Sequence, residues 1–153
     1  IVHHGFFWRN EARTIVGVRK RRIAALLAAD VSLFGVHLPL DAHEELGNNT
    51  GLLRAIGAQP LERFGTESPQ LGWLGGIERA PVAEVVARIE AALSRPPLWL
   101  PGGGTDVSTI AVVTGGGAGY FEAAVDRGAE LFVTGELVPR GEKKFILVVK
   151  SYL

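Results

Sequence analysis

The chain of 153 residues contains no cysteine. This absence excludes disulfide bridges, iron–sulfur clusters and thiolate zinc sites, so any metal ion must be bound by nitrogen and oxygen ligands. Methionine is also absent, even at position 1, and the sequence opens inside an apolar run that resembles a strand. We therefore expect this sequence to be a fragment of a longer protein.

An excess of charge of one sign and long hydrophobic runs are missing as well. The 16 basic residues balance the 16 acidic ones, so no overall field attracts nucleic acid or an anionic membrane. No apolar run approaches the roughly 20 residues that span a bilayer. The first residues also lack the charged start and longer apolar stretch of a secretory signal. We expect a cytoplasmic protein that binds neither nucleic acid nor membranes.

The sequence does contain an alternation of strand-like and helix-like segments. Short apolar or β-branched runs predict strands, and an apolar stripe at helical spacing predicts a helix. The predicted helices cover residues 14–29, 51–56, 81–93 and 120–126. The predicted strands cover residues 1–2, 31–36, 61–64, 71–77, 109–113 and 130–133. This alternation indicates an α/β fold. We expect two interleaved α/β lobes with mostly parallel sheets: an incomplete metal-site lobe over 1–65 and a second lobe over 66–153.

All the histidines lie near the N-terminus, at His3, His4, His37 and His43. Adjacent side chains of a strand point to opposite faces, so His3 and His4 are poorly placed to bind one ion together. Where the strand ends and the chain turns at Gly5, they can instead bind two neighbouring ions. A carboxylate such as Asp41 suits a hard or borderline divalent ion, and imidazole suits Zn, Fe, Mn, Co or Ni. The structural alternative is that the histidine pair caps a strand and His37 forms a hydrogen bond in a core.

Several stretches together resemble the Nif-three-like dinuclear metal centre family, whose members are also labelled GTP cyclohydrolase I type 2 homologues. They are 1–8 (IVHHGFFW), the basic helix around 19–22 (RKRR) and 35–49 (GVHLPLDAHEELGNN). The later segments 114–117 (TGGG) and 133–136 (VTGE) fit the same family. The combination of the His-His-Gly and His-Leu-Pro-Leu-Asp stretches is specific, whereas the glycine turns alone would be weak. The resemblance covers nearly all of the chain up to Glu136.

This resemblance implies a ring-shaped homohexamer with a centre of two divalent ions in each subunit. His3 and His4 match the paired histidines that bind different ions, and Asp41 matches a carboxylate ligand. His37 matches a site histidine that supports the ligands or faces the substrate, and we predict it as a catalytic residue that moves a proton. Glu136 follows the end of a predicted strand, so it is either a catalytic acid beside the metals or a polar residue that ends the strand. We predict it as a second catalytic residue.

Parts of the family pattern are missing from this sequence. The family completes its centre with a late His-His-x-x-Glu stretch and has a strand and helix region before the first histidine pair; neither occurs here. After Glu136 the sequence departs from the pattern, and residues 137–141 (LVPRG) resemble a protease site of expression linkers. We therefore expect this chain to lack both terminal parts and to hold an incomplete metal centre.

The resemblance and the ligand types favour metal-dependent hydrolysis of a small-molecule substrate, a nucleotide or heterocycle. The family label implies ring opening of GTP. The alternative is a metal-binding ring that serves as an interaction scaffold or metal carrier without catalysis. Two further segments have competing interpretations. The glycine-rich stretch 114–119 is either an anion cradle or a tight turn, and 19–22 is either a nucleic-acid patch or a solvated helix face. We favour the structural interpretation of both.

Overall fold

The computed structural model describes residues 1–7, 12–102, 104–136 and 146–148. The chain forms two compact units, Ile1–Leu40 and Asp41–Leu153. The expected division into lobes over 1–65 and 66–153 stays a prediction.

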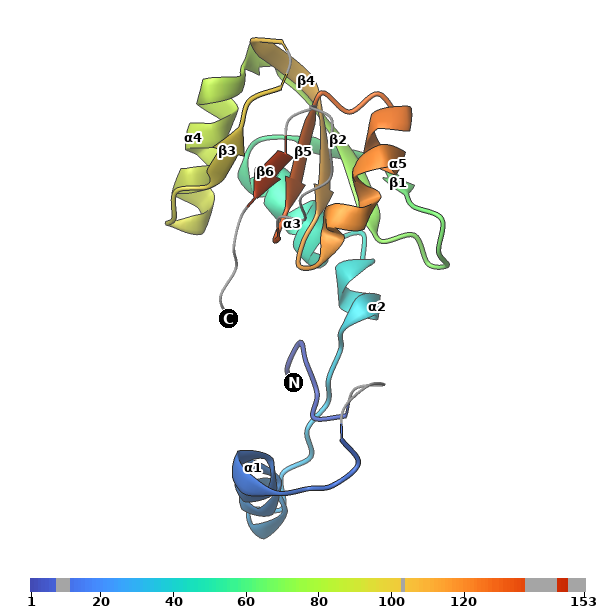
Figure 1. The fold of residues 1–153 in the computed structure, drawn as a ribbon, viewed down its shortest axis with the longest axis vertical. Coiled ribbons are helices and arrows are strands. Elements are labelled where there is room, and N and C mark those ends of the chain that lie inside the picture. The colour runs from blue at the N-terminus through green and yellow to red at the C-terminus, as the bar shows by residue number, and fades with distance from the viewer. Residues whose placement is uncertain (8–11, 103, 137–145, 149–153) are drawn as a thin grey trace. The chain divides into compact units, whose positions relative to one another are not determined.

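The second unit is built on a six-stranded mixed sheet (Figure 1). Its strands are β1 (Gln59–Phe64), β2 (Gly72–Pro81), β3 (Leu98–Leu100), β4 (Asp106–Val113), β5 (Leu131–Thr134) and β6 (Ile146–Val148). The spatial order is β1-β2-β4-β5-β6-β3. The β4–β5 and β5–β6 pairs are parallel, whereas β1–β2, β2–β4 and β3–β6 are antiparallel.

The α/β fold is confirmed, but the prediction of mostly parallel sheets is wrong. A parallel pair needs a crossover of about a dozen residues or more, usually a helix. Only the short segment 65–71 separates β1 from β2, so these strands pair as an antiparallel hairpin. The alternation of strand, helix and strand that predicts parallel pairing is found at β4 and β5, which α5 connects.

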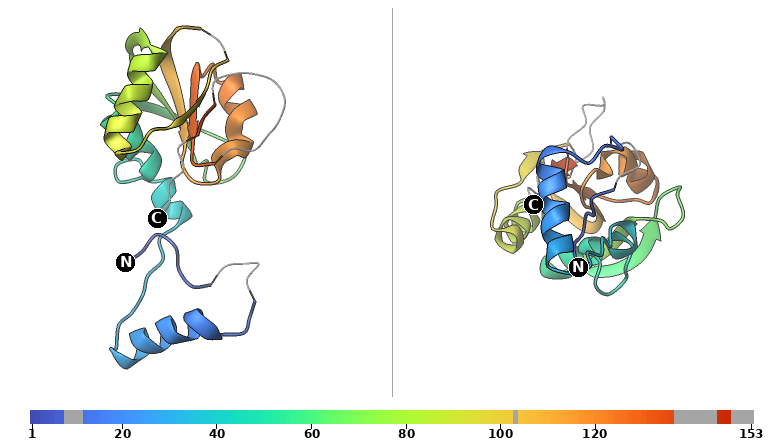
Figure 2. Two further views of the ribbon diagram at one scale, coloured as in Figure 1. Left: turned by 60° about the vertical axis from the view of Figure 1, so that its left-hand side comes forward. Right: turned by 90° about the horizontal axis from the view of Figure 1, so that it is seen from below.

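Helices cover both faces of this sheet (Figure 2). They are α3 (Asn48–Ala55), α4 (Val82–Leu93), the 3-10 turn η1 (Gly117–Tyr120) and α5 (Phe121–Asp126). Because successive strand side chains point to opposite faces, β4 contributes to two cores. Ile110 and Val112 pack with α3 and α4, while Ala111 and Val113 pack with α5 and η1.

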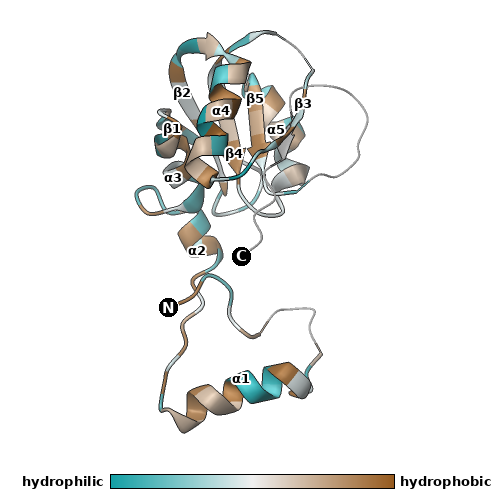
Figure 3. Ribbon diagram, turned by 90° about the vertical axis from the view of Figure 1, so that its left-hand side faces the viewer, coloured by the Kyte–Doolittle hydropathy of each residue, from teal (hydrophilic) through white to brown (hydrophobic). Residues whose placement is uncertain are grey.

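The predicted helix over 81–93 corresponds to α4, and its apolar stripe explains its position. Val82, Val85 and Ile89 are buried against the sheet, and each fully buried aliphatic side chain contributes about 1.5–3 kcal/mol. Figure 3 shows the hydrophobic colouring of β5 in the sheet that α4 covers. The helix ends at Leu93 and is followed by Ser94, which adopts the left-handed conformation (φ 51°) two residues before a proline pair.

The first unit contains α1 (Gly17–Ala28) and a parallel bridge between Val2 and Gly35. The predicted strands over 1–2 and 31–36 are thus reduced to a single bridge in the described residues. The predicted helix over 14–29 is confirmed as α1, yet none of its residues is buried. Its apolar side chains instead border an open pocket of about 810 Å³ that His37 also lines. No helix in the described ranges is long and apolar enough to cross a membrane.

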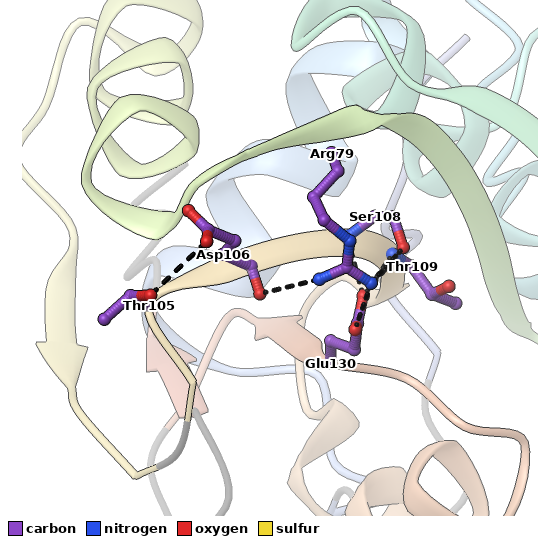
Figure 4. Close-up of polar contacts among 6 residues, drawn as sticks. All are labelled: Arg79, Thr105, Asp106, Ser108, Thr109 and Glu130. Atoms are coloured by element: carbon purple, nitrogen blue, oxygen red, sulfur yellow. Dashed lines mark hydrogen bonds and ion pairs between the residues drawn. The ribbon is translucent and has the colours of Figure 1, made fainter.

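Glu130, just before β5, ties that strand to the start of β4 (Figure 4). Its carboxylate accepts hydrogen bonds from the Ser108 amide at 2.6 Å, the Ser108 hydroxyl at 2.9 Å and the Thr109 amide at 3.0 Å. Arg79 donates to the other oxygen at 2.9 Å. Burial raises the pKa of Glu130, but these hydrogen bonds outweigh it and lower the pKa to about 2.

We expect Glu130→Gln to lower the free energy of unfolding by about 1–2 kcal/mol at pH 7, allowing for solvent screening of a carboxylate one-third exposed. A folded pKa below the unfolded value adds stability above the unfolded value of about 4.5, and that stability is lost as pH falls toward 2. Urea unfolding from pH 7 to pH 3 should show the difference from wild type shrinking. Glu122→Gln, an exposed change on α5, should have little effect. If the difference in unfolding free energy between Glu130→Gln and wild type did not change with pH, the stabilising role of the ionised Glu130 carboxylate would be contradicted.

Candidate metal centre

The first unit brings two distant segments side by side through its parallel bridge. The Val2 amide donates to the Phe34 carbonyl at 2.9 Å, and the Val36 amide donates to the Val2 carbonyl at 2.9 Å. Parallel pairing sends both segments in the same direction. The residues that follow Val2 therefore lie beside those that follow Gly35, which places His3 and His4 next to His37.

These three histidines form a cluster, here called the histidine cluster. Their ligand nitrogens, one from each ring, all lie within 4.8 Å of one another. The ring centroids are 4.6 Å apart for His3 and His4, 4.7 Å for His4 and His37, and 5.0 Å for His3 and His37. Zinc–nitrogen bonds of about 2.0–2.1 Å place tetrahedral ligands about 3.3 Å apart. The three nitrogens would have to draw closer to reach that spacing, and the cluster is a group that could hold a divalent ion.

Gly35 permits the close approach that builds this cluster. A Cβ atom at position 35 would lie 2.8 Å from the Gly5 nitrogen and 3.0 Å from the Gly5 Cα. Backbone atoms of the neighbouring segment cannot move away as the end of a flexible side chain can. Any larger residue would therefore push apart the two segments that carry the histidines.

Gly35→Ala is expected to weaken zinc binding on the order of 10–100-fold, the range typical when the groups that orient ligands are disturbed. Competition with a chromophoric chelator would measure the dissociation constant. The matched control is Gly51→Ala on α3, where a Cβ meets nothing within 4 Å and alanine favours the helix. Unchanged zinc affinity in folded Gly35→Ala would show that this contact does not shape the cluster.

Asp41 lies in the second unit, at the end of the one-turn helix α2 (Leu38–Asp41). It is 9% exposed, and two consecutive residues of α3 hold it. Asn48 donates from Nδ2 to the Asp41 Oδ1 atom at 2.9 Å, and Asn49 donates to the Asp41 carbonyl at 3.3 Å. Both the side chain and the main chain of Asp41 are thus fixed from the first turn of α3.

Asn49 also connects this region to two loops at the end of the sheet. It is 1% exposed, donates to the Leu71 carbonyl at 2.7 Å and accepts from the Thr114 amide at 2.7 Å. From the sequence, Asn48, Asn49 and Thr50 are interpreted as the cap of the predicted helix over 51–56. In the structure Gly47 is the N-cap residue and makes no side-chain capping bond. The two consecutive asparagines close to Asp41 in the sequence were the signal that could have predicted their hydrogen bonds to Asp41.

The carboxyl ends of β4 and β5 carry the remaining predicted residue, Glu136. The Gly135 amide donates to the Gly115 carbonyl at 3.0 Å, which joins the two loops. A Cβ on Gly116 would lie 3.3 Å from a Glu136 carboxylate oxygen, so the side chain of Glu136 lies beside the glycine-rich loop. Gly115 has φ +68°, as expected for the tight turn we predicted over this stretch.

The structure brings some of the predicted site residues together and not others. It groups His3, His4 and His37, and it anchors Asp41 through the two asparagines of α3. Ligation by His3, His4 and Asp41 and catalysis by His37 and Glu136 stay predictions. Arg19 of the basic stretch bonds to the Phe6 and Ala12 carbonyls. The departure from the family pattern over 137–141 lies outside the described residues.

A mixed α/β fold and a surface cluster of imidazoles together define a protein with a candidate metal centre. A sequence profile of the family described as Duf34/NIF3 (NGG1p interacting factor 3) matches residues 1–140. The chain belongs to this family, which confirms the resemblance drawn from its motifs.

Relatives of this chain carry the label expected from the motifs. A GTP cyclohydrolase 1 type 2 homolog of Neisseria meningitidis serogroup B is 41% identical over 138 residues, which are 90% of this chain and 55% of the relative. A homolog with the same description from Escherichia coli K12 is also 41% identical over 138 residues, with the same coverage. The chain thus spans 55% of the length of these curated relatives.

Solved structures have the same fold. Protein ybgI, described as of unknown function, superposes with a TM-score of 0.87 at 35% identity, covering 97% of this chain and 62% of its own. A protein from Thermus thermophilus gives a TM-score of 0.78 at 32% identity, covering 97% and 61%. Reduced HcgD from Methanocaldococcus jannaschii, at 18% identity and a TM-score of 0.76, covers 96% and 60% and supports the fold alone.

Proposed function

We propose that this protein binds two divalent metal ions per subunit and uses them to hydrolyse a nucleotide or heterocycle in the cytoplasm. The histidine cluster is the observation that supports metal binding, because its three ligand nitrogens lie within 4.8 Å of one another. The second ion follows from the family resemblance alone. His4 is exposed, and His3 and His37 are partly exposed, so ions and water can reach the cluster. The candidate ions are Zn, Fe, Mn, Co and Ni.

The residues have separate parts in this proposal. When bound, divalent ions would polarise the substrate and lower the pKa of coordinated water toward neutrality. His3 and His4 provide imidazole ligands, and Asp41 provides a carboxylate ligand predicted from the family resemblance. His37 either completes the ligand set or moves a proton. Glu136 acts as a further acid or base on the substrate.

Metal content and turnover test the proposal together. Full-length protein purified without chelator and soaked in Zn, Mn or Fe salts should contain about two ions per subunit by elemental analysis. Hydrolysis of GTP or another nucleotide should rise and fall with that content. A metal-to-subunit ratio near zero after soaking would overturn the proposal.

The competing function is a metal-binding scaffold or metal carrier. The cluster supports this function equally well, because imidazole ligation does not require catalysis. Tight metal binding without turnover across a nucleotide library would favour it. A substrate-dependent rate that tracks bound metal would favour the enzyme.

The proposed assembly is a homohexameric ring with its metal sites facing an enclosed cavity. Exposed apolar side chains on α1 and along β3 are consistent with surfaces that need partners. Sedimentation at micromolar concentration should give six times the subunit mass. A monomeric mass would contradict the assembly.

A further inference from the structure

We propose that Asn48 is a positioning residue that orients the Asp41 carboxylate toward a divalent ion. This inference rests on the proposed function, in which Asp41 is a metal ligand. Its basis is the contact from Asn48 Nδ2 to Asp41 Oδ1 at 2.9 Å, combined with the bond from Asn49 to the Asp41 carbonyl at 3.3 Å.

These two contacts act on different parts of Asp41. The Asn49 bond fixes the main chain at the end of α2, and Asn49 is itself held by its bonds to Leu71 and Thr114. The Asn48 bond fixes the rotation of the carboxylate about its side chain. Both anchors come from the first turn of α3, so one helix turn holds the main chain of Asp41 and one of its carboxylate oxygens.

The chemistry of the donor suits a ligand better than a structural ion pair. An arginine or lysine in this place would neutralise the buried carboxylate and compete with a metal ion for it. Asn48 donates a hydrogen bond through an amide and adds no positive charge beside the Asp41 carboxylate. Metal-binding carboxylates are commonly held by such hydrogen bonds, and loss of the supporting group typically weakens metal affinity about 10–100-fold.

Because Asn48 is exposed, its effect on metal binding can be tested without disturbing the fold. Asn48 is exposed, whereas Asn49 is buried. Asn48 begins α3, and alanine is a better helix former than asparagine. Asn48→Ala should therefore leave the unfolding midpoint nearly unchanged while it removes the hydrogen bond to Asp41.

The test compares Asn48→Ala with Thr50→Val on the same helix. Thr50 is fully buried and donates to the His43 and Gly47 carbonyls, so Thr50→Val removes hydrogen bonds that do not touch Asp41. Zn²⁺ affinity is measured by chelator competition, and the visible absorption of bound Co²⁺ reports ligand geometry. Full-length protein is used throughout.

We expect Asn48→Ala to weaken Zn²⁺ binding about 10–100-fold and to change the Co²⁺ spectrum. Thr50→Val should lower the unfolding midpoint and keep both metal readouts. Zn²⁺ affinity of Asn48→Ala within twofold of wild type would overturn the positioning role and leave the proposed function standing. Absence of Zn²⁺ binding by wild type would overturn both, and equal losses of affinity in both variants would assign the effect to α3 packing.

Discussion

If His37 is a metal ligand, His37→Ala is expected to weaken zinc binding more than 100-fold. The change removes one of three imidazole nitrogens that lie within 4.8 Å of one another. Loss of a direct ligand should exceed the 10–100-fold typical of a supporting group. Isothermal titration with Zn²⁺ and elemental analysis after dialysis would measure the loss.

The same variant separates the two roles open to His37. A proton-transfer role would leave zinc affinity intact and lower the hydrolysis rate, whereas a ligand role removes the metal and the rate together. His43→Ala is the matched control, because His43 accepts hydrogen bonds at Nδ1 from the Glu45 and Leu46 amides at 3.1 Å and lies outside the histidine cluster. Equal losses in both variants would argue that the effect is not specific to the cluster.

Local sequence patterns predicted most elements of the second unit because its core is self-contained. The apolar stripe of α4 and the alternation along β4 each bury against a partner within the unit. The pattern could not give the direction of β1 and β2, because side-chain periodicity is the same in parallel and antiparallel strands. The length of segment 65–71 was the better signal.

The first unit shows a different limit. The stripe on α1 predicted a helix correctly, but periodicity identifies an apolar face and not what covers it. The His3-His4 pair and His37 were singled out from their residue types and from the family resemblance. Their proximity depends on the bridge between Val2 and Gly35, a long-range contact that no local pattern encodes.

The asparagines of α3 were missed for a physical reason. Asparagine before an apolar helical stretch usually caps the helix. Capping alone already explained Asn48 and Asn49, so there was no reason in the sequence to expect long-range contacts from them. The bonds of Asn49 to Leu71 and Thr114 join segments 22 and 65 residues away. Such partners become visible only when the sheet brings its loops together.

Asn49→Asp is expected to lower the free energy of unfolding by about 3–5 kcal/mol at pH 7. The change replaces the NH₂ group that donates to the Leu71 carbonyl at 2.7 Å and the Asp41 carbonyl at 3.3 Å with an oxygen. At this position, which is 1% exposed, the new negative charge is buried against two carbonyl oxygens. A buried charge without a compensating partner costs several kcal/mol. Urea unfolding in the presence of chelator would measure the loss.

The pH dependence of this variant identifies the cause. Burial raises the folded pKa of the introduced carboxyl above its unfolded value of about 3.9. The protonated carboxyl can donate to the Leu71 carbonyl and accept from the Thr114 amide, as asparagine does. Its stabilising bonds are therefore present below the unfolded pKa and are lost as pH rises through the folded pKa. The deficit relative to wild type should shrink from pH 7 to pH 4, whereas Asn49→Ala should show a deficit of about 2–3 kcal/mol that does not change with pH. Parallel pH profiles for the two variants would show that Asn49 acts through packing and not through its hydrogen bonds.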